Sequence, residues 1–190
     1  MSSAAPLVLW TIGHSTRTLD EFIGLLKAHG VQTVADVRRF PGSRKYPHFN
    51  AAALEAGLAV AGLGYVALPE LGGRRKPRPD SPNTVWRNPS FQGYADYMET
   101  PEFDQALQRL LAAARRFPTA VMCAEAVWWR CHRALIADTL TAQGVVVRHI
   151  LSLTRSEVHP YTAAARLLHG RLSYAGGEPA RGSTGAEKES

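Results

Sequence analysis

The sequence contains only two cysteines, Cys123 and Cys131. Two thiols are too few for a disulfide framework, so a reducing, cytoplasmic location is expected. No run of about 18 apolar residues occurs, so neither a membrane-spanning helix nor a membrane partner is expected. The first residues lack the basic stretch that precedes the apolar part of a secretory signal, and no such signal is expected. The dinucleotide fingerprint G-x-G-x-x-G is also missing, and no cofactor is expected.

The composition is that of a globular protein with a surplus of positive charge. Of 190 residues, 45% are hydrophobic and 20% are charged, which suits one domain with a sizeable core. Lys and Arg number 22 against 16 Asp and Glu, and the net charge is +6. Basic residues cluster at 38–45 and 74–78. These clusters fit either a solvated surface or an anionic partner, which would be a small molecule or a nucleic acid.

Apolar runs and amphipathic segments alternate along the chain. The run 7–13 predicts a buried strand, and the capping-box pair Thr18 and Glu21 predicts a helix that stops at Gly30. Similar patterns predict strands at 31–37, 65–68, 119–123 and 145–150, and helices at 51–61, 91–99, 101–117, 131–143 and 160–169. This alternation predicts a single three-layer α/β domain over residues 1–170, with a mostly parallel sheet of about five strands, Rossmann-like or flavodoxin-like.

Two segments fall outside this alternation. Residues 69–90 are rich in Pro and Arg, and loops of this length are usually functional or disordered, so a flexible basic loop over the site is expected. Residues 171–190 are dominated by Gly, Pro, Ser and Glu, and a disordered C-terminal tail is expected there.

Ligands of open α/β sheets bind beyond the carboxyl ends of the strands, where the strand order reverses. We assume the order 3-2-1-4-5 for strands numbered along the chain, which puts the reversal between the first and the fourth strand. This order places His14 and Ser15 beside Cys123. Asp36 and Arg38 then lie one strand away.

The stretch around the fourth predicted strand carries most of the polar chemistry. Cys123 and Glu125 end the strand, and Cys131, His132 and Arg133 open the following helix. A carboxylate just past a buried strand is expected to be partly desolvated, which raises its pKa toward a useful acid/base range. Glu125 is therefore the principal catalytic candidate, with a salt bridge to Arg133 or a helix N-cap as the structural alternative.

Cys123 admits two interpretations. A thiolate near a helix N-terminus and cations can be a nucleophile, whereas a thiol at the end of a strand is often a small buried hydrophobe. Cysteine-dependent phosphatases have Arg six positions after the nucleophile, and Trp129 occupies that position here, so their chemistry is disfavoured. Zinc binding by Cys123, Cys131, His132 and His14 does not match a recognised ligand spacing, and no metal is expected.

The remaining candidates follow other strands or open the last long helix. His14 and His132 are candidate acid/base groups, and Asp36 is either a catalytic carboxylate or the partner of an arginine. Arg133 at a helix start can form a bidentate fork to an anion, and paired glycines allow a tight turn or a close backbone approach. The predicted substrate-binding residues are Ser15, Arg38, Ser43, Gly72, Gly73, Cys131 and Arg133.

Four short motifs occur in order over about residues 10–150. They are Thr11-Ile12-Gly13-His14-Ser15, Asp36-Val37-Arg38 followed by Pro41 and Ser43, Leu71-Gly72-Gly73, and Cys123-Ala124-Glu125 with Cys131-His132-Arg133. In this set the chain resembles the bacterial and archaeal family called domain of unknown function 488. The resemblance implies an α/β domain with these polar clusters at its site, and it implies no established reaction. The family commonly has Pro or other small residues before the Cys-His-Arg motif, where this chain has Val127-Trp128-Trp129.

The leading functional hypothesis is an enzyme that acts on a nucleotide, a nucleic acid or another phosphate-bearing substrate by hydrolysis or transfer. Glu125 would be the acid/base or the nucleophile, assisted by His14, Asp36 and, in one version, Cys123. One alternative is a non-enzymatic nucleic-acid-binding module. The other is a thiol-dependent enzyme or redox sensor that uses Cys123.

Overall fold

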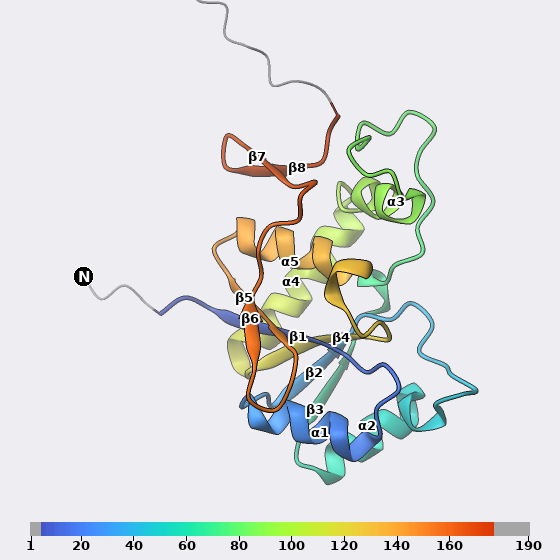
Figure 1. Cartoon of the computed structure of the whole chain (residues 1–190), viewed down its shortest axis with the longest axis vertical. Helices are drawn as coiled ribbons and strands as arrows, with labels where there is room; N and C mark the ends of the chain where they lie inside the picture. The colour runs from blue at the N-terminus through green and yellow to red at the C-terminus, as the bar shows by residue number, and fades with distance from the viewer. Residues whose placement is uncertain (1–4, 177–190) are drawn as a thin grey trace, which may run out of the picture.

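A six-stranded sheet forms the centre of the structure, a computed structural model that describes residues 5–176 (Figure 1). The strand order is β3-β2-β4-β1-β5-β6, and all neighbours pair in parallel except β5 and β6, which are antiparallel. The strands are β1 (Val8–Gly13), β2 (Thr33–Asp36), β3 (Gly64–Ala67), β4 (Thr119–Cys123), β5 (Val146–Ile150) and β6 (Ser156–Val158). The predicted α/β class and mostly parallel sheet are confirmed, and β6 is an additional edge strand.

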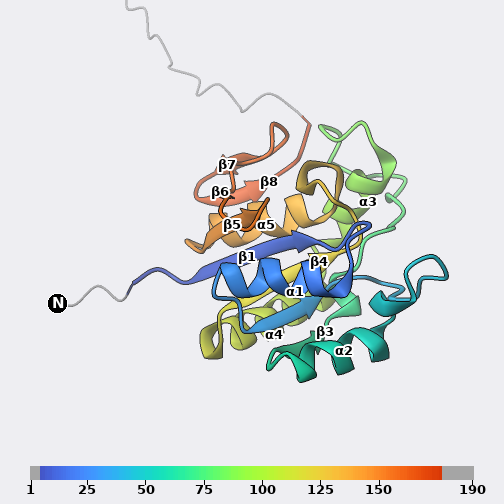
Figure 2. The same ribbon diagram turned by 60° about the horizontal axis from the view of Figure 1, so that its bottom comes forward.

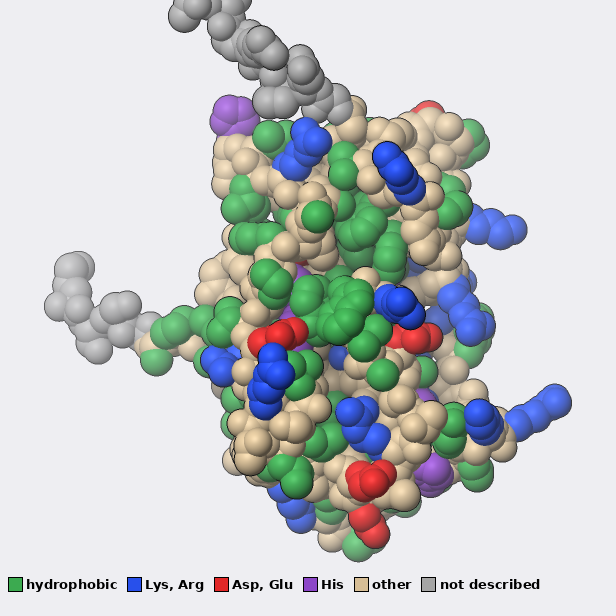
Figure 3. All heavy atoms as spheres, in the orientation of Figure 1, with side chains coloured by type: hydrophobic (Ala, Val, Ile, Leu, Met, Phe, Trp, Pro, Cys, Tyr) green, Lys and Arg blue, Asp and Glu red, His purple; other side chains and the backbone are tan. Residues whose placement is uncertain are grey.

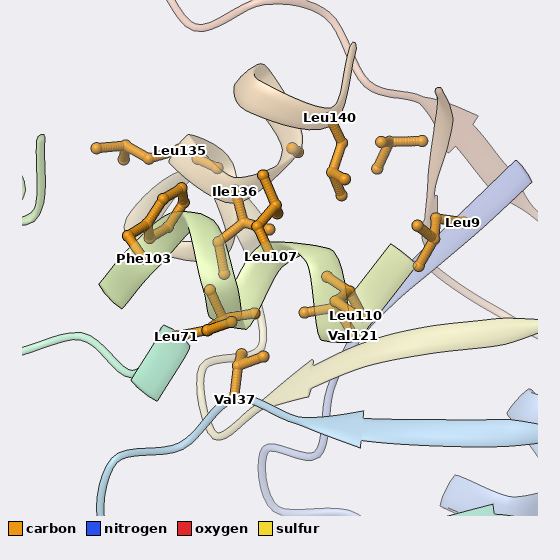
Figure 4. Close-up of a cluster of buried hydrophobic side chains, with 14 of the residues drawn as sticks. Leu9, Val37, Leu71, Phe103, Leu107, Leu110, Val121, Leu135, Ile136 and Leu140 are labelled. Atoms are coloured by element: carbon orange, nitrogen blue, oxygen red, sulfur yellow. The ribbon is translucent and has the colours of Figure 1, made fainter. Parts of the chain in front are cut away.

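Helices cover both faces of the sheet (Figures 1 and 2). One core cluster joins α1 (Leu19–Ala28) and α2 (Ala51–Val60) to one face, and the other joins α3 (Pro89–Tyr97), α4 (Pro101–Arg116) and α5 (Arg133–Ala142) to the opposite face. Figure 4 shows Leu107 and Leu110 of α4 lying between α5 and the side chain of Val121 on β4. Within residues 5–176, every helix is too short or too polar to cross a bilayer.

Local sequence signals explain where several elements begin. Thr18 accepts a hydrogen bond from the backbone N–H of Glu21, and the Glu21 carboxylate accepts one from the backbone N–H of Thr18, so α1 starts with the predicted capping box. Thr100 caps α4, which has Pro101 at its first position and acidic residues in its first turn. Short 3-10 turns, η1 (Pro47–Phe49), η2 (Pro69–Leu71) and η3 (Trp128–Arg130), lie in the loops.

The assumed strand order is wrong, because β4 lies between β2 and β1. All five residues of β4 are buried, which suits a strand that is paired on both edges and covered on both faces. Gly13 is in register with Cys123, and Asp36 is in register with Met122. The end of β4 is therefore flanked by the ends of β1 and β2, so Asp36 lies nearer to Cys123 than the assumed order predicts.

The predicted helix at 160–169 is also wrong, since this region forms the hairpin of β7 (Arg166–Leu168) and β8 (Arg171–Ser173). His169 and Gly170 have φ angles of 51° and 77°, which fit the two-residue turn whose twist matches a β-hairpin. The predicted disordered tail is wrong for residues 171–176, which contain β8 and the buried Tyr174. Its remainder, residues 177–190, lies outside the described residues.

The Asp96 carboxylate of α3 binds the middle of the basic loop 69–90. Asp96 accepts hydrogen bonds from the backbone N–H of Arg78 at 2.7 Å, from the Ser81 hydroxyl at 2.5 Å and from the Asn83 amide at 2.8 Å. These bonds attach the middle of the loop to α3, while its predicted flexibility stays a prediction.

Gly13→Ala is expected to destabilise the protein by about 3 kcal/mol, because a Cβ there would collide with the backbone carbonyl of Glu125. Gly24→Ala is the matched control: a Cβ at this α1 position meets nothing closer than 4.0 Å. Alanine in a helix should there raise stability by about 0.5 kcal/mol. Urea denaturation of both variants checks this, and equal stability losses would contradict the close approach at Gly13.

Candidate functional site

The carboxyl ends of β1, β2 and β4 meet through backbone hydrogen bonds. The N–H groups of His14 and Ser15 donate to the carbonyl oxygens of Cys123 and Ala124 at 2.9 and 3.0 Å. On the other side of β4, the N–H of Val37 donates to Met122 at 3.0 Å. These bonds bring the three predicted polar clusters to one edge of the sheet, as expected for a ligand site in an open α/β fold.

Two adjoining hollows open at this edge. One has a volume of about 460 Å³, and its lining includes the predicted residues Arg38, Gly73, Cys123, Glu125, Cys131 and His132. The other, of about 400 Å³, shares Arg38 and Glu125 with the first and adds His14, Ser15 and Ser43. Asp36, Gly72 and Arg133 line neither hollow.

Arginine dominates the charge around the larger hollow. Arg38, Arg39, Arg74 and Arg130 line it, and Glu125 is the single acidic residue among the described residues of its lining. In Figure 3, Lys and Arg side chains gather along the side of the molecule where the loop after β2 projects in Figure 1. The hollow therefore offers an electropositive surface to an anion.

Two thiols lie at the floor of this hollow. The Sγ atoms of Cys123 and Cys131 are 2.7 Å apart, and both residues are free and buried. The Nε–H of Arg133 donates to Cys123 Sγ at 2.9 Å, and His132 Nδ1 lies 3.5 Å from Cys131 Sγ. The two sulfurs thus contact each other, with the guanidinium against Cys123 and the imidazole beside Cys131.

The two thiols have opposite pKa shifts. Burial raises the pKa of Cys123, and the hydrogen bond and charge of Cys131 raise it further, to well above its ordinary value. Burial also acts to raise the pKa of Cys131, but the Cys123 hydrogen bond, His132 and Arg133 outweigh it, so this pKa lies well below its ordinary value. The arrangement favours a Cys131 thiolate that accepts a hydrogen bond from the Cys123 thiol, whereas the sequence made Cys123 one candidate nucleophile and Cys131 a predicted substrate-binding residue.

Arg133 does not form the predicted fork toward a bound anion. Arg133 is 1% exposed. Its guanidinium donates to Cys123 Sγ, to the backbone oxygen of Glu125 at 2.6 Å and to Thr11 Oγ1 at 3.3 Å. A salt bridge with the Glu125 carboxylate, the structural alternative for that residue, is absent among residues 5–176. Arg133 is consumed by structural contacts and by the thiol pair.

Asp36 has the alternative role of an arginine partner. Its carboxylate accepts bonds from Arg38 Nε at 2.9 Å and Nη2 at 2.6 Å, and from the Tyr65 hydroxyl at 2.9 Å. Arg38 Nη1 further donates to the backbone oxygen of Phe49 at 2.8 Å and lies 3.3 Å from His14 Nε2. A carboxylate saturated in this way positions Arg38 at the wall of both hollows and is not free to accept a substrate proton.

His14 is held as a neutral ring. An arginine N–H can only donate, so His14 Nε2 accepts from Arg38, and Nδ1 donates to the backbone oxygen of Ser15 at 3.0 Å. Burial, followed by the charge of Arg38, lowers the pKa of His14 to about 4. The ring also stacks on Phe49 with a centroid distance of 4.2 Å. Both nitrogens are engaged, so the predicted acid/base role of His14 lacks a free atom.

Glu125 is exposed, so the expected partial burial of its carboxylate is wrong. The loop after β4 turns outward at Ala124, which leaves the side chain on the rim shared by both hollows. Ser43 has a local task, because its hydroxyl accepts from the N–H of Tyr46 at 3.0 Å at the start of η1. Ser15 lines the smaller hollow with a left-handed φ of 50°.

The paired glycines permit close packing, as predicted. A Cβ on Gly72 would lie 2.7 Å from the backbone N of Arg39, and one on Gly73 would lie 2.9 Å from His132 Nδ1. His132 Nε2 is 3.3 Å from the backbone oxygen of Val37. The glycines therefore bring the loop after β3 against the imidazole that contacts the thiols.

Sequence reasoning missed a set of polar residues buried behind the thiols, which are Thr11, Asp138, His149 and His159. Their one signal in the sequence is a polar residue inside an apolar strand or on an apolar helix face, which is too common to single them out. Sequence reasoning also did not assign Arg39, Arg74 and Arg130, which line the larger hollow, to the site. Among residues 5–176, no group of three or more His, Cys, Asp or Glu side chains is arranged to hold a metal ion.

The fold and the site define a three-layer α/β protein with a thiol pair at the carboxyl edge of its sheet. Residues 18–140 match the model of the family described as domain of unknown function DUF488, and the chain belongs to this family. The resemblance found in the motifs is thereby confirmed. No curated protein and no solved structure matches the chain.

Native stability is expected to fall as the pH is lowered from about 6.5 to about 4. An unfolded histidine takes up a proton near pH 6.5, whereas native His14 does so only near its pKa of about 4. The lowered pKa thus contributes stability above pH 6.5 that is lost as the pH falls through this window. Urea denaturation from pH 7 to pH 4 should show a shallower loss in His14→Gln. His169→Asn, on the exposed hairpin turn, should keep the wild-type profile, and an unchanged profile in His14→Gln would contradict the assignment.

Mild oxidation is expected to join Cys123 and Cys131 within one chain. Hydroxyethyl disulfide can exchange with the Cys131 thiolate to give a mixed disulfide, and Cys123, 2.7 Å away, then displaces the second hydroxyethanethiol. Intact mass should show the loss of two hydrogens. In Cys123→Ser the mixed disulfide should persist as an added hydroxyethylthio group. A stable adduct on the wild type would show that the two sulfurs do not react with each other.

Proposed function

We propose that this protein is an enzyme that acts on a phosphate-bearing substrate by group transfer or hydrolysis, with Cys131 as the nucleophile. The observation that carries the proposal is the Cys123–Cys131 pair, 2.7 Å apart, at the floor of a cavity lined by four arginines. Thiolates, and not thiols, are nucleophiles, and positive neighbours favour the thiolate form.

The acid/base version of the hypothesis has less support. His14 uses both ring nitrogens and Asp36 is saturated by Arg38 and Tyr65, so neither offers a free atom to substrate. Glu125 remains available on the rim. In the proposed mechanism the Cys131 sulfur is therefore the nucleophile, and Glu125 is the general base.

The proposed reaction has two steps. Cys131 Sγ attacks an electrophilic carbon or phosphorus and forms a bond to it. The bond between that atom and the leaving group breaks, and the leaving group keeps the electron pair and takes a proton from water. Water or another acceptor then attacks the sulfur-bound group, which restores the thiolate, and Glu125 takes the proton released by the attacking molecule. The Cys123 thiol and Arg133 stabilise the thiolate between turnovers.

The arginines account for the class of substrate. Arg38 is held rigidly by Asp36, while Arg39, Arg74 and Arg130 are exposed at the mouth of the cavity. Guanidinium groups bind phosphate oxygens through paired hydrogen bonds, and several of them around one cavity favour an anion over a neutral ligand.

Alkylation of Cys131 by iodoacetamide tests the nucleophile. The wild type should react at Cys131 with a pH midpoint below the usual value for a thiol, about 8.5. Pyrophosphate should slow the reaction because it occupies the cavity above the sulfur. In Arg39→Ala this protection should weaken by about fivefold, as expected for the loss of roughly 1 kcal/mol of a charge-assisted contact.

Arg115→Ala is the matched control, since Arg115 lies in the last turn of α4 and lines neither hollow. It should keep wild-type protection. A midpoint at the value of a free thiol, or alkylation that pyrophosphate does not slow, would overturn the proposal.

One observation favours a second candidate function, the binding of single-stranded nucleic acid. Phe40 and Trp129 are 66% and 54% exposed, and each directly follows or precedes an arginine of the cavity wall. Exposed rings beside arginines suit the stacking of unpaired bases. Oligonucleotide binding that falls with salt and is equal in the wild type and Cys131→Ser would favour this module over the enzyme.

A further inference from the structure

A chain of buried hydrogen bonds runs from Arg133 away from the cavity. Arg133 Nη1 lies 3.3 Å from Thr11 Oγ1, which lies 2.6 Å from His149 Nδ1. His149 Nε2 lies 2.9 Å from His159 Nδ1, and His159 Nε2 lies 2.8 Å from Asp138 Oδ1. This chain of hydrogen bonds connects α5, β1, β5 and the segment after β6 through a continuous row of polar atoms.

A carboxylate that accepts several hydrogen bonds lies at the far end of this row. Asp138 also accepts from the backbone N–H of Thr162 at 2.9 Å, from its hydroxyl at 2.6 Å and from the Tyr174 hydroxyl at 2.7 Å. Because a carboxylate with this many donors only accepts hydrogen bonds, His159 Nε2 must donate to it. Burial lowers the pKa of His149 to about 3, so its neutral ring donates from one nitrogen and accepts at the other, between Thr11 and His159. In either tautomer the Thr11 oxygen keeps a lone pair for Arg133 Nη1.

The chain of hydrogen bonds is shielded from water. Asp138 is fully buried, His149 is 1% exposed, and the indole of Trp128 stacks on His149 with a centroid distance of 4.3 Å and an interplanar angle of 5°. Trp128 belongs to η3, in the loop that links the two cysteines. Buried polar groups in such a row have few alternative partners, so each one restricts the orientation of the next.

We propose that Thr11, His149, His159 and Asp138 are positioning residues that hold the guanidinium of Arg133 against the thiol pair and thereby set the reactivity of Cys131. The inference rests on the proposed function, because it assigns these residues to the thiol chemistry. Arg133 has no carboxylate in ion-pair contact within residues 5–176, so neutral acceptors alone orient its guanidinium. Removal of the Thr11 hydroxyl frees Nη1 and lets the plane rotate away from Cys123.

Other charged and titratable groups also face the thiols. Cys123 from β4 and His132 and Arg133 from the start of α5 contact or neighbour Cys131, and Tyr94 of α3 lies behind His132 at a ring distance of 5.2 Å. The hollow above the thiols is lined by Arg38, Arg39, Arg74, Arg130 and Glu125. A substitution at Thr11 leaves all of these side chains in place. A change in thiol reactivity would therefore report on the orientation of Arg133.

Thr11→Val is the test, because valine keeps the shape of threonine and removes the hydroxyl. The pH midpoint of Cys131 alkylation by iodoacetamide should rise by about half a pH unit, which makes the reaction at pH 7 about threefold slower. Thr11→Ser restores the hydroxyl and should restore the midpoint. Thr119→Val is the matched control, a fully buried threonine of β4 whose hydroxyl bonds to Phe117 at the other end of the sheet. It should keep the wild-type midpoint.

Each outcome discriminates. A low wild-type midpoint that is unchanged in Thr11→Val overturns the positioning role and leaves the proposed function standing. A wild-type midpoint equal to that of a free thiol overturns the proposed function itself. If Thr11→Val does not fold, Asp138→Asn provides the same measurement from the far end of the chain, and an unchanged midpoint there counts equally against the inference.

Discussion

The burial of the Arg133 guanidinium is the constraint on which the carboxyl edge of the sheet depends. A cation removed from water is costly unless its N–H groups find acceptors. Arg133 finds them in the Cys123 sulfur, the Glu125 backbone oxygen and the Thr11 hydroxyl, which belong to β4, the loop after it and β1. Satisfying one side chain thus fixes the relative positions of two strand ends and draws the loop after β4 over Gly13, where a side chain would not fit.

The two buried arginines of the site differ in what neutralises them. Arg38 is paired with the Asp36 carboxylate, so its charge is largely compensated and its role is to shape the wall between the two hollows. Within the described part of the chain, the guanidinium of Arg133 has only neutral oxygens and a sulfur as hydrogen-bond partners, so its charge remains available to a thiolate. This difference is one reason why the proposed function assigns the nucleophile to Cys131 and not to the carboxylates that the sequence favoured.

Much of the fold follows from local patterns. The capping box of Thr18 and Glu21, the apolar run of β4 and the proline that opens α4 act over a few residues, so their elements could be placed without knowledge of the rest. The strand order could not, because β4 pairs with β1 and β2 across about a hundred residues of chain. The hairpin at His169 and Gly170 was missed because a short apolar stretch fits a helix or a strand equally well.

By itself, the sequence determined the α/β class, most element positions and the fact that polar residues follow buried strands, since these depend on side-chain periodicity and on turn residues close together in the chain. Only the tertiary structure decided which of those polar groups remain free. Asp36 and Arg38 form an ion pair, and Glu125 is exposed to solvent. Thr11 forms a hydrogen bond with His149, which lies 138 positions away in the sequence. The physical reason is that a hydrogen-bonding group is defined by its partners, and buried groups take their partners from whichever strands the sheet brings together.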